Sequence, residues 1–189
     1  MGVDVISAKD VGIYHTKVIT AGDSGGLIGW LNENGFRFEE SDKPVLDHYI
    51  QSGWCFVVAV VRPDANTDLK TGLDGLVDPV ILRFGTPSPT YPLALTSTIG
   101  TETQVLIYLV STRKMIAEDR MPLQYAGRFA ASDLASITTE PEEHFRGWET
   151  NLTYLCKFKA ALTAWQMRRD LTFTPAPDDE PYPEHRIRW

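Results

Sequence analysis

A glycine-flanked serine is the first group in this sequence that could do chemistry. It lies in the string Gly22-Asp23-Ser24-Gly25-Gly26. A serine hydroxyl becomes a nucleophile when a histidine takes its proton and a carboxylate orients that histidine, while backbone amides stabilise the oxyanion that forms. These residue types therefore indicate acyl transfer, such as the hydrolysis of an ester or amide, if the other groups are present.

The surroundings of Ser24 do not fit that chemistry. The string resembles the nucleophile segment of the chymotrypsin-like serine proteases, in which the histidine and the aspartate precede the serine on a strand-rich barrel. Here His15 is the one histidine before Ser24, and a helical pattern follows it. We therefore interpret the string as a turn in which Asp23 or Ser24 caps a helix. The alternative is a serine hydrolase in which Ser24 uses His144 or His185 from downstream.

A run of oxygen-bearing side chains is the second candidate, at Asp64-Ala65-Asn66-Thr67-Asp68. Oxygens at alternate positions begin many calcium loops. The sixth position of such a loop should be glycine and is Leu69, and the twelfth should be glutamate and is Gly75. We interpret the run as a solvated turn. The alternative is an irregular calcium site completed by Asp74 and Asp78, in a calcium-dependent sugar-binding or adhesion domain.

The remaining candidates are single side chains. The histidines are spread along the chain, at His15, His48, His144 and His185. None lies four residues from another, as a helical metal site requires. Trp148, Trp165 and Trp189 are of the type that stacks on sugars, but packing explains the first two more simply. We therefore assign no catalytic, cofactor-binding or metal-binding residue, and we expect no cofactor and no enzymatic activity.

Composition and charge exclude several classes of partner. The 189 residues are 43% hydrophobic and 23% charged, as in globular domains with a core of their own. The net charge of −7 repels phosphate backbones, and the densest basic stretches, 157–159, 168–169 and 186–188, are short. The sequence contains no apolar run long enough to span a membrane. The first residues lack the basic region and the apolar stretch of a signal peptide, so we expect none. We expect an unknown protein or small-molecule ligand, no nucleic acid and no membrane insertion.

The elements that must position these residues come in blocks. The first half predicts strands over 3–8, 13–19 and 54–61 and helices over 26–33 and 42–53. The run 54–61 is continuously apolar, which predicts a strand covered on both faces in the middle of a sheet. Cys55 and Cys156 lie among apolar residues, which predicts two buried thiols, with a bridge between them as the alternative.

The second half predicts mostly strands, over 77–84, 91–99, 104–110, 115–117, 123–129 and 171–174. Segment 151–159 alternates between apolar and polar residues and predicts another strand, with a helix as the alternative. Thr163 and Gln166 have the spacing of a capping box, which predicts a short helix to Asp170.

The order of these elements predicts an α+β fold, a mostly antiparallel sheet with a few short helices packed on one face. We expect residues 1–175 to form a single globular domain. The remaining residues, 176–189, are rich in proline and acidic side chains and predict an extended or disordered C-terminal tail.

Short phrases along the chain carry a resemblance to a known family. They include 11–14, 29–36, 49–57, 91–97, 105–110 and 166–173. In order and spacing the chain resembles the bacterial proteins grouped as domain of unknown function 2330. That family has no assigned activity, so the resemblance implies no site residue. Its members often look exported, so the resemblance implies a location in the cell envelope. The N-terminus of this chain does not show the signal-peptide pattern of those members. We therefore expect a non-catalytic binding or structural module of the bacterial cell envelope.

Overall fold

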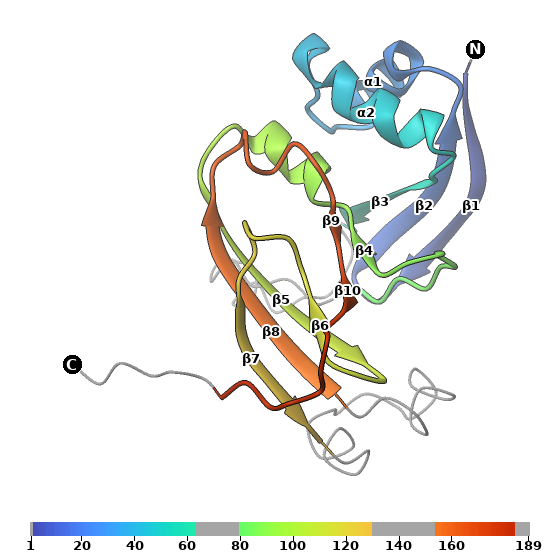
Figure 1. Cartoon of the computed structure of the whole chain (residues 1–189). Coiled ribbons are helices and arrows are strands. Elements are labelled where there is room, and N and C mark those ends of the chain that lie inside the picture. The colour runs from blue at the N-terminus through green and yellow to red at the C-terminus, as the bar shows by residue number, and fades with distance from the viewer. Residues whose placement is uncertain (1, 63–79, 130–153, 184–189) are drawn as a thin grey trace, which may run out of the picture. The chain divides into compact units, whose positions relative to one another are not determined.

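Antiparallel strands and a few short helices make up the fold, which divides into two units, Met1–Phe84 and Gly85–Trp189. The computed structural model describes residues 2–62, 80–129 and 154–183, which Figure 1 draws in colour. All of the strand pairs in these ranges are antiparallel. The predicted α+β class is confirmed.

The first unit is a three-stranded sheet with helices. Its elements in chain order are β1 (Val3–Val11), β2 (Tyr14–Ala21), α1 (Ser24–Glu33), the 3₁₀ helix η1 (Glu40–Asp42), α2 (Lys43–Gln51) and β3 (Phe56–Val61). The strand order is β1-β2-β3. Gly12 makes the turn between β1 and β2 with a positive φ of 53°, which glycine adopts without steric cost.

Both α-helices contact the same face of this sheet. Lys17 of β2 lies with its Nζ 5.2 Å from the ring centroid of Trp30 in α1. Phe56 of β3 lies opposite Ile19 and shares that face, and its ring centroid is 6.3 Å from that of Tyr49 in α2. The predicted packing of short helices on one face is therefore confirmed here. Among the described residues, none of the helices is both long and apolar enough to cross a membrane.

The prediction for 54–61 as a covered, central strand is wrong. The strand begins at Phe56 and lies at the end of the order, and the side chains of Val57, Val60 and Val61 are 43–46% exposed. Valine favours strands because its branched side chain fits the pleated backbone, so a valine run predicts a strand without predicting that both faces are buried. The predicted strand at 77–84 is also wrong over 80–84, which join no ladder, and 77–79 lie outside the described residues.

The second unit is built from short strand pairs around one longer sheet. Its elements are β4 (Thr90–Tyr91), the 3₁₀ helix η2 (Leu93–Ile99), β5 (Thr103–Ser111), β6 (Met115–Ile116), β7 (Leu123–Arg128), β8 (Tyr154–Leu162), β9 (Leu171–Thr172) and β10 (Thr174–Pro175). The longer sheet has the order β5-β8-β7, and β10 pairs with β6 and β4 with β9.

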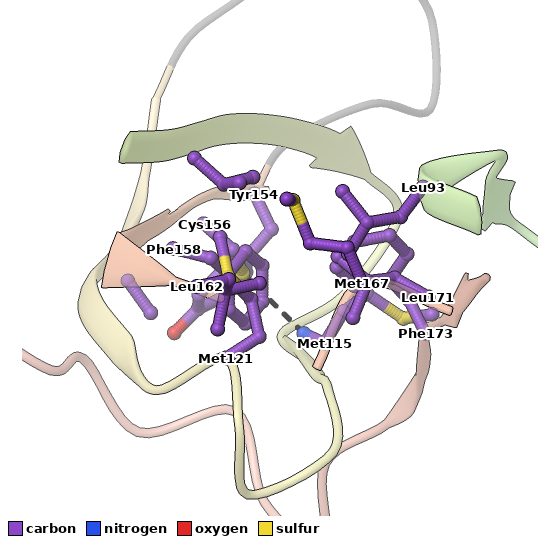
Figure 2. Packing of buried hydrophobic residues seen from close by; sticks show 12 residues of the cluster. Leu93, Met115, Met121, Tyr154, Cys156, Phe158, Leu162, Met167, Leu171 and Phe173 are labelled. Atoms are coloured by element: carbon purple, nitrogen blue, oxygen red, sulfur yellow. Dashed lines mark hydrogen bonds between the residues drawn. The ribbon is translucent and has the colours of Figure 1, made fainter. Parts of the chain in front are cut away.

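One face of β8 is the centre of the buried cluster shown in Figure 2. Tyr154, Cys156 and Phe158 are each 0% exposed, so the predicted alternation, and with it the strand, is confirmed for the described part of 151–159. The sulfur of Cys156 accepts the backbone N–H of Met115 at 3.4 Å, and burial raises the pKa of this thiol. Both cysteines are free, but Cys55 is exposed, so the prediction of two buried thiols holds for Cys156 alone.

The prediction of a strand over 91–99 is wrong beyond Tyr91. Residues 93–99 form η2, in which Ser97 Oγ donates to the Ala94 carbonyl at 2.7 Å and Thr98 Oγ1 donates to the Leu95 carbonyl at 2.9 Å. Side-chain hydroxyls that bond nearby carbonyls give the backbone an alternative to the hydrogen bonds of a strand ladder. The apolar residues of 91–99 predict a strand, whereas the hydroxyl-to-carbonyl bonds of Ser97 and Thr98 accompany a 3₁₀ helix.

The start of the predicted tail packs against the second unit. Ala176 is 3% exposed, and Tyr182 pairs with Ala126 of β7 through two backbone hydrogen bonds of 2.7 and 2.8 Å. The backbone N–H of Lys114 donates to Asp179 Oδ1 at 2.9 Å. Residues 176–183 are therefore extended and held by specific contacts, while the single domain over 1–175 stays a prediction.

Candidate functional site

Ser24 lies at the start of α1, where Asp23 caps the helix. The Asp23 carboxylate accepts the N–H of Gly26 at 2.7 Å, and Ser24 is 5% exposed. His15 and Ala21 are six residues apart on β2, which at about 3.3 Å per residue separates His15 from the Ser24 turn by roughly 20 Å. His15 therefore cannot take a proton from Ser24. His144 and His185 lie outside the described residues, so the hydrolase alternative stays untested.

An exposed cluster at the other end of β2 contains His15. Its Nδ1 lies 2.8 Å from Asp10 Oδ1, and Arg62 Nη1 donates to Asp10 Oδ2 at 3.0 Å. The hydrogen bond from His15, followed by that from Arg62, lowers the pKa of Asp10. These ion pairs lie at the surface and stabilise little. The cluster links β1 and β2 to the residue after β3. We interpret it as a contact between neighbouring strands at the surface.

The predicted calcium loop at 64–68, together with Asp74 and Asp78, lies outside the described residues. Within the ranges that are described, no group of three or more histidine, cysteine, aspartate or glutamate side chains is placed to hold a metal ion.

A hollow of about 390 Å³ lies in the second unit after β8. It is lined by Arg120, Trp165, Gln166, Arg168 and Arg169. Trp165 is 74% exposed, so the interpretation of this tryptophan as a packing residue is wrong. Arg168 and Arg169 are also exposed. A large aromatic ring and two cations therefore meet at one concave surface.

The turn that carries Trp165 begins with the predicted capping box. Gln166 Oε1 accepts the backbone N–H of Thr163 at 3.0 Å, and the N–H of Gln166 donates to Thr163 Oγ1 at 3.4 Å. Two backbone hydrogen bonds of a helical turn follow, from Met167 N–H to the Thr163 carbonyl at 3.1 Å and from Arg168 N–H to the Trp165 carbonyl at 3.4 Å. The capping box is confirmed, but the predicted helix to Asp170 is wrong, because the chain makes one turn and then bends.

The side chain of Arg120 explains why the helix stops. Its guanidinium donates to the carbonyl of Gln166, to that of Arg169 at 2.9 Å and to that of Asp170 at 2.7 Å. Its Nε is also 3.2 Å from Glu118 Oε2, and the Arg120 side chain is 11% exposed. These carbonyls would point along the axis of a continuing helix, so the guanidinium replaces helical partners and bends the chain around itself.

Two further contacts hold the turn. Met167 is 0% exposed and lies in the buried cluster of Figure 2, beside Leu93 and Leu171. Asp170 Oδ1 accepts the backbone N–H of Ala94 at 2.9 Å. The cap, the guanidinium and the buried Met167 fix the backbone, so Trp165 is presented to solvent on a rigid support.

The charges around the hollow are unbalanced. Glu118 pairs with Arg120, and Asp170 is turned toward Ala94. Within the described ranges, neither Arg168 nor Arg169 forms an ion pair with an acidic side chain, and the ring of Trp165 makes no ring–ring or cation–π contact. The surface therefore offers two guanidinium groups and an uncovered indole ring.

The family model described as an uncharacterised protein conserved in bacteria, domain of unknown function 2330, matches residues 1–174. The chain belongs to this family. In this member of the domain of unknown function 2330 family the matched span covers all of the residues that line the hollow. No curated protein and no solved structure matches the chain.

The sequence alone predicts some of the residues that line this hollow, but not all of them. Trp165 and Arg168 are three residues apart after a capping box, which places them on one side of a helical turn, with Met167 on another. The missing part is Arg120, which is 46 residues from Gln166 in the chain. Nothing local to 163–170 indicates that a distant guanidinium ends the helix and leaves the indole exposed.

Proposed function

We propose that this protein is a non-catalytic binding module of the bacterial cell envelope and that the turn at 163–170 contacts its ligand. The observation that carries the proposal is the 74% exposure of Trp165 on a backbone fixed by Arg120 and Met167. Burying a large apolar side chain stabilises a fold by about 1.5–3 kcal/mol. A tryptophan held away from the core forgoes that stabilisation, and exposed tryptophan and arginine are the residues that dominate binding surfaces.

The side chains of the hollow define the ligand's chemistry. The Arg168 and Arg169 guanidinium groups match carboxylate or phosphate oxygens. The flat face of Trp165 suits the carbon-rich face of a sugar or another ring. We therefore infer a small anionic ligand with a flat apolar face, such as an acidic sugar. None of the lining residues is a side chain that exchanges protons near neutral pH, which favours binding over catalysis. The envelope location rests on the exported character that the family resemblance implies.

Nuclear magnetic resonance titrations of the whole chain test the proposal. We expect glucuronate and glucose 6-phosphate to shift the indole N–H signal of Trp165, and glucose at the same concentration to leave it in place. Comparing the two anions shows whether carboxylate or phosphate is preferred. The double substitution Arg168→Gln with Arg169→Gln should abolish the shift.

A matched control removes the same charge from the first unit. Lys9→Gln with Arg37→Gln changes two exposed cations there and should leave the titration unchanged. The proposal fails if none of the anions shifts the Trp165 signal, or if the control pair weakens the shift as much as the substitutions at Arg168 and Arg169.

A further inference from the structure

The first strand of the first unit, β1, is an open edge. Within the described residues it pairs with β2 and with no other strand, and Figure 1 shows it as the outer strand of its sheet. All of its residues after Val3 are exposed, among them Val5 at 48% and Ile6 at 59%. The backbone N–H and C=O groups on the free side of such a strand are a template for pairing with another strand.

One extra residue in β1 changes the direction of the side chains around it. Val5 lies opposite Ile19 of β2. Ser7 lies opposite Val18, the adjacent residue of β2. Ile6 is therefore the extra residue of a β-bulge, and side chains before and after it share a face when they are an odd number of positions apart.

Asp4 and Lys9 are such a pair. They lie opposite Thr20 and Thr16 of β2, which are four residues apart in a strand and therefore share a face. Both are exposed, and within the described ranges neither side chain makes an ion pair or a hydrogen bond. When the bulged residue is left out of the count, Asp4 and Lys9 are each two positions from Ser7. The free edge therefore carries opposite charges placed symmetrically about its centre.

We propose that β1 pairs with β1 of a second copy of this chain, in an antiparallel arrangement with a twofold axis at Ser7. In this register Asp4 of each copy lies opposite Lys9 of the other, so two ion pairs form across the axis. A slip by one residue would place these charges on opposite faces of the joined sheet, so the ion pairs select the register. A self-complementary patch of this kind gives a closed twofold dimer.

The charges on β1 favour a copy of the chain over other strands. A charged side chain on an edge strand usually prevents association, because it lies beside an apolar or like-charged neighbour. The charges of β1 find opposite partners when the incoming strand is β1 itself. The other edge of the sheet, β3, has no charged residue over Phe56–Val61 and therefore nothing that selects a register. Two paired edge strands bury less than the roughly 1,000 Å² of a stable interface, so we expect a reversible dimer.

Sedimentation equilibrium of the whole chain, at concentrations up to about 1 mM, tests the proposal. We expect the wild type to dimerise as the concentration rises. Asp4→Lys and Lys9→Asp should each weaken the dimer at least about tenfold, because like charges then face each other at two places. An equimolar mixture of the two variants should recover the dimer, since each opposed pair then joins a positive group to a negative one.

The net charge separates this contact from general repulsion between chains. Each substitution changes the charge of −7 by two, in opposite directions, so a nonspecific effect would strengthen association in one variant and weaken it in the other. Glu102→Lys is the matched control, because Glu102 is exposed in the second unit and its substitution changes the charge as Asp4→Lys does. It should dimerise as the wild type does.

Three results would overturn the proposal. The wild type stays monomeric at about 1 mM, the mixture is no more associated than the separate variants, or Glu102→Lys weakens the dimer as much as Asp4→Lys. Since Asp4 and Lys9 are exposed, their substitution leaves the fold intact and the comparison stands.

A cysteine at the axis tests the register itself. In a chain with Cys55→Ser, which removes the exposed thiol, Ser7→Cys should form a disulfide-linked dimer under a mild oxidant. Directly opposite residues of an antiparallel pair have Cβ atoms about 4.5–5.5 Å apart, close enough for this bond to form with a small adjustment. Ala8→Cys in the same background lies opposite Val5 of the partner copy and should crosslink at least about tenfold more slowly. Equal crosslinking at the two positions would contradict a twofold axis at Ser7.

Discussion

Two turns of this protein begin in the same way and end differently. At 23–26 the Asp23 carboxylate caps a helix that continues for ten residues, and Ser24 is buried within it. At 163–166 a reciprocal cap begins a helix that stops after one turn and leaves Trp165 exposed. The first turn carries residues typical of catalysis and serves packing, while the second has no catalytic motif and leaves an aromatic ring and two arginines exposed.

The difference lies in a long-range contact. The helix that follows Asp23 continues to Glu33, with Leu27, Ile28 and Leu31 buried along it and Ser24 covered. The Arg120 guanidinium takes the carbonyls that would extend the second helix. Both turns begin with a side-chain cap, and the contact with Arg120 distinguishes the turn that leaves its aromatic residue exposed.

The largest effect on stability should come from Arg120→Gln. It removes the donor from three carbonyls and exposes the buried Met167 beneath the turn, so we expect a loss of about 3 kcal/mol in the free energy of unfolding. Urea unfolding followed by circular dichroism measures it. Arg37→Gln, at an exposed position, should stay within about 0.5 kcal/mol of the wild type. If both variants are equally stable, Arg120 does not hold the turn.

A smaller effect is expected at the first turn. Asp23→Ala removes the cap from α1 and should cost about 1 kcal/mol, while Asp23→Asn keeps a capping oxygen and should cost much less. The same urea titration compares them. Binding of anions at Trp165 should be unchanged in both variants. Equal destabilisation by alanine and asparagine would show that the cap is not what Asp23 provides.

The smallest effect, no chemical labelling, is expected at Ser24. Because the hydroxyl is buried and His15 lies at the far end of β2, a fluorophosphonate probe should leave Ser24 unmodified in the folded protein, as mass spectrometry of the labelled chain would show. A serine protease treated in parallel confirms that the probe is active. Label on Ser24 that disappears in Ser24→Ala would restore the hydrolase alternative and reverse the comparison.

Much of the fold could be predicted from the sequence. The predictions that are wrong concern features that depend on contacts with distant residues. The alternation at Tyr154, Cys156 and Phe158 predicted both the strand and its buried face, because period and burial are properties of the segment itself. The valine run at 56–61 predicted a strand but not its place at an edge, which depends on partner strands. Trp165 was assigned to packing because its exposure depends on Arg120, and no local pattern contains that contact.

The central claim is that Trp165 serves binding and not packing, and Trp165→Ala tests it most directly. The free energy of unfolding and the glucuronate-induced shift of the Arg168 backbone amide can be measured on the same sample. We predict stability within about 0.5 kcal/mol of the wild type, together with loss of the shift. A variant that keeps the shift but loses about 3 kcal/mol or more, as a buried aromatic does on truncation, would contradict the claim.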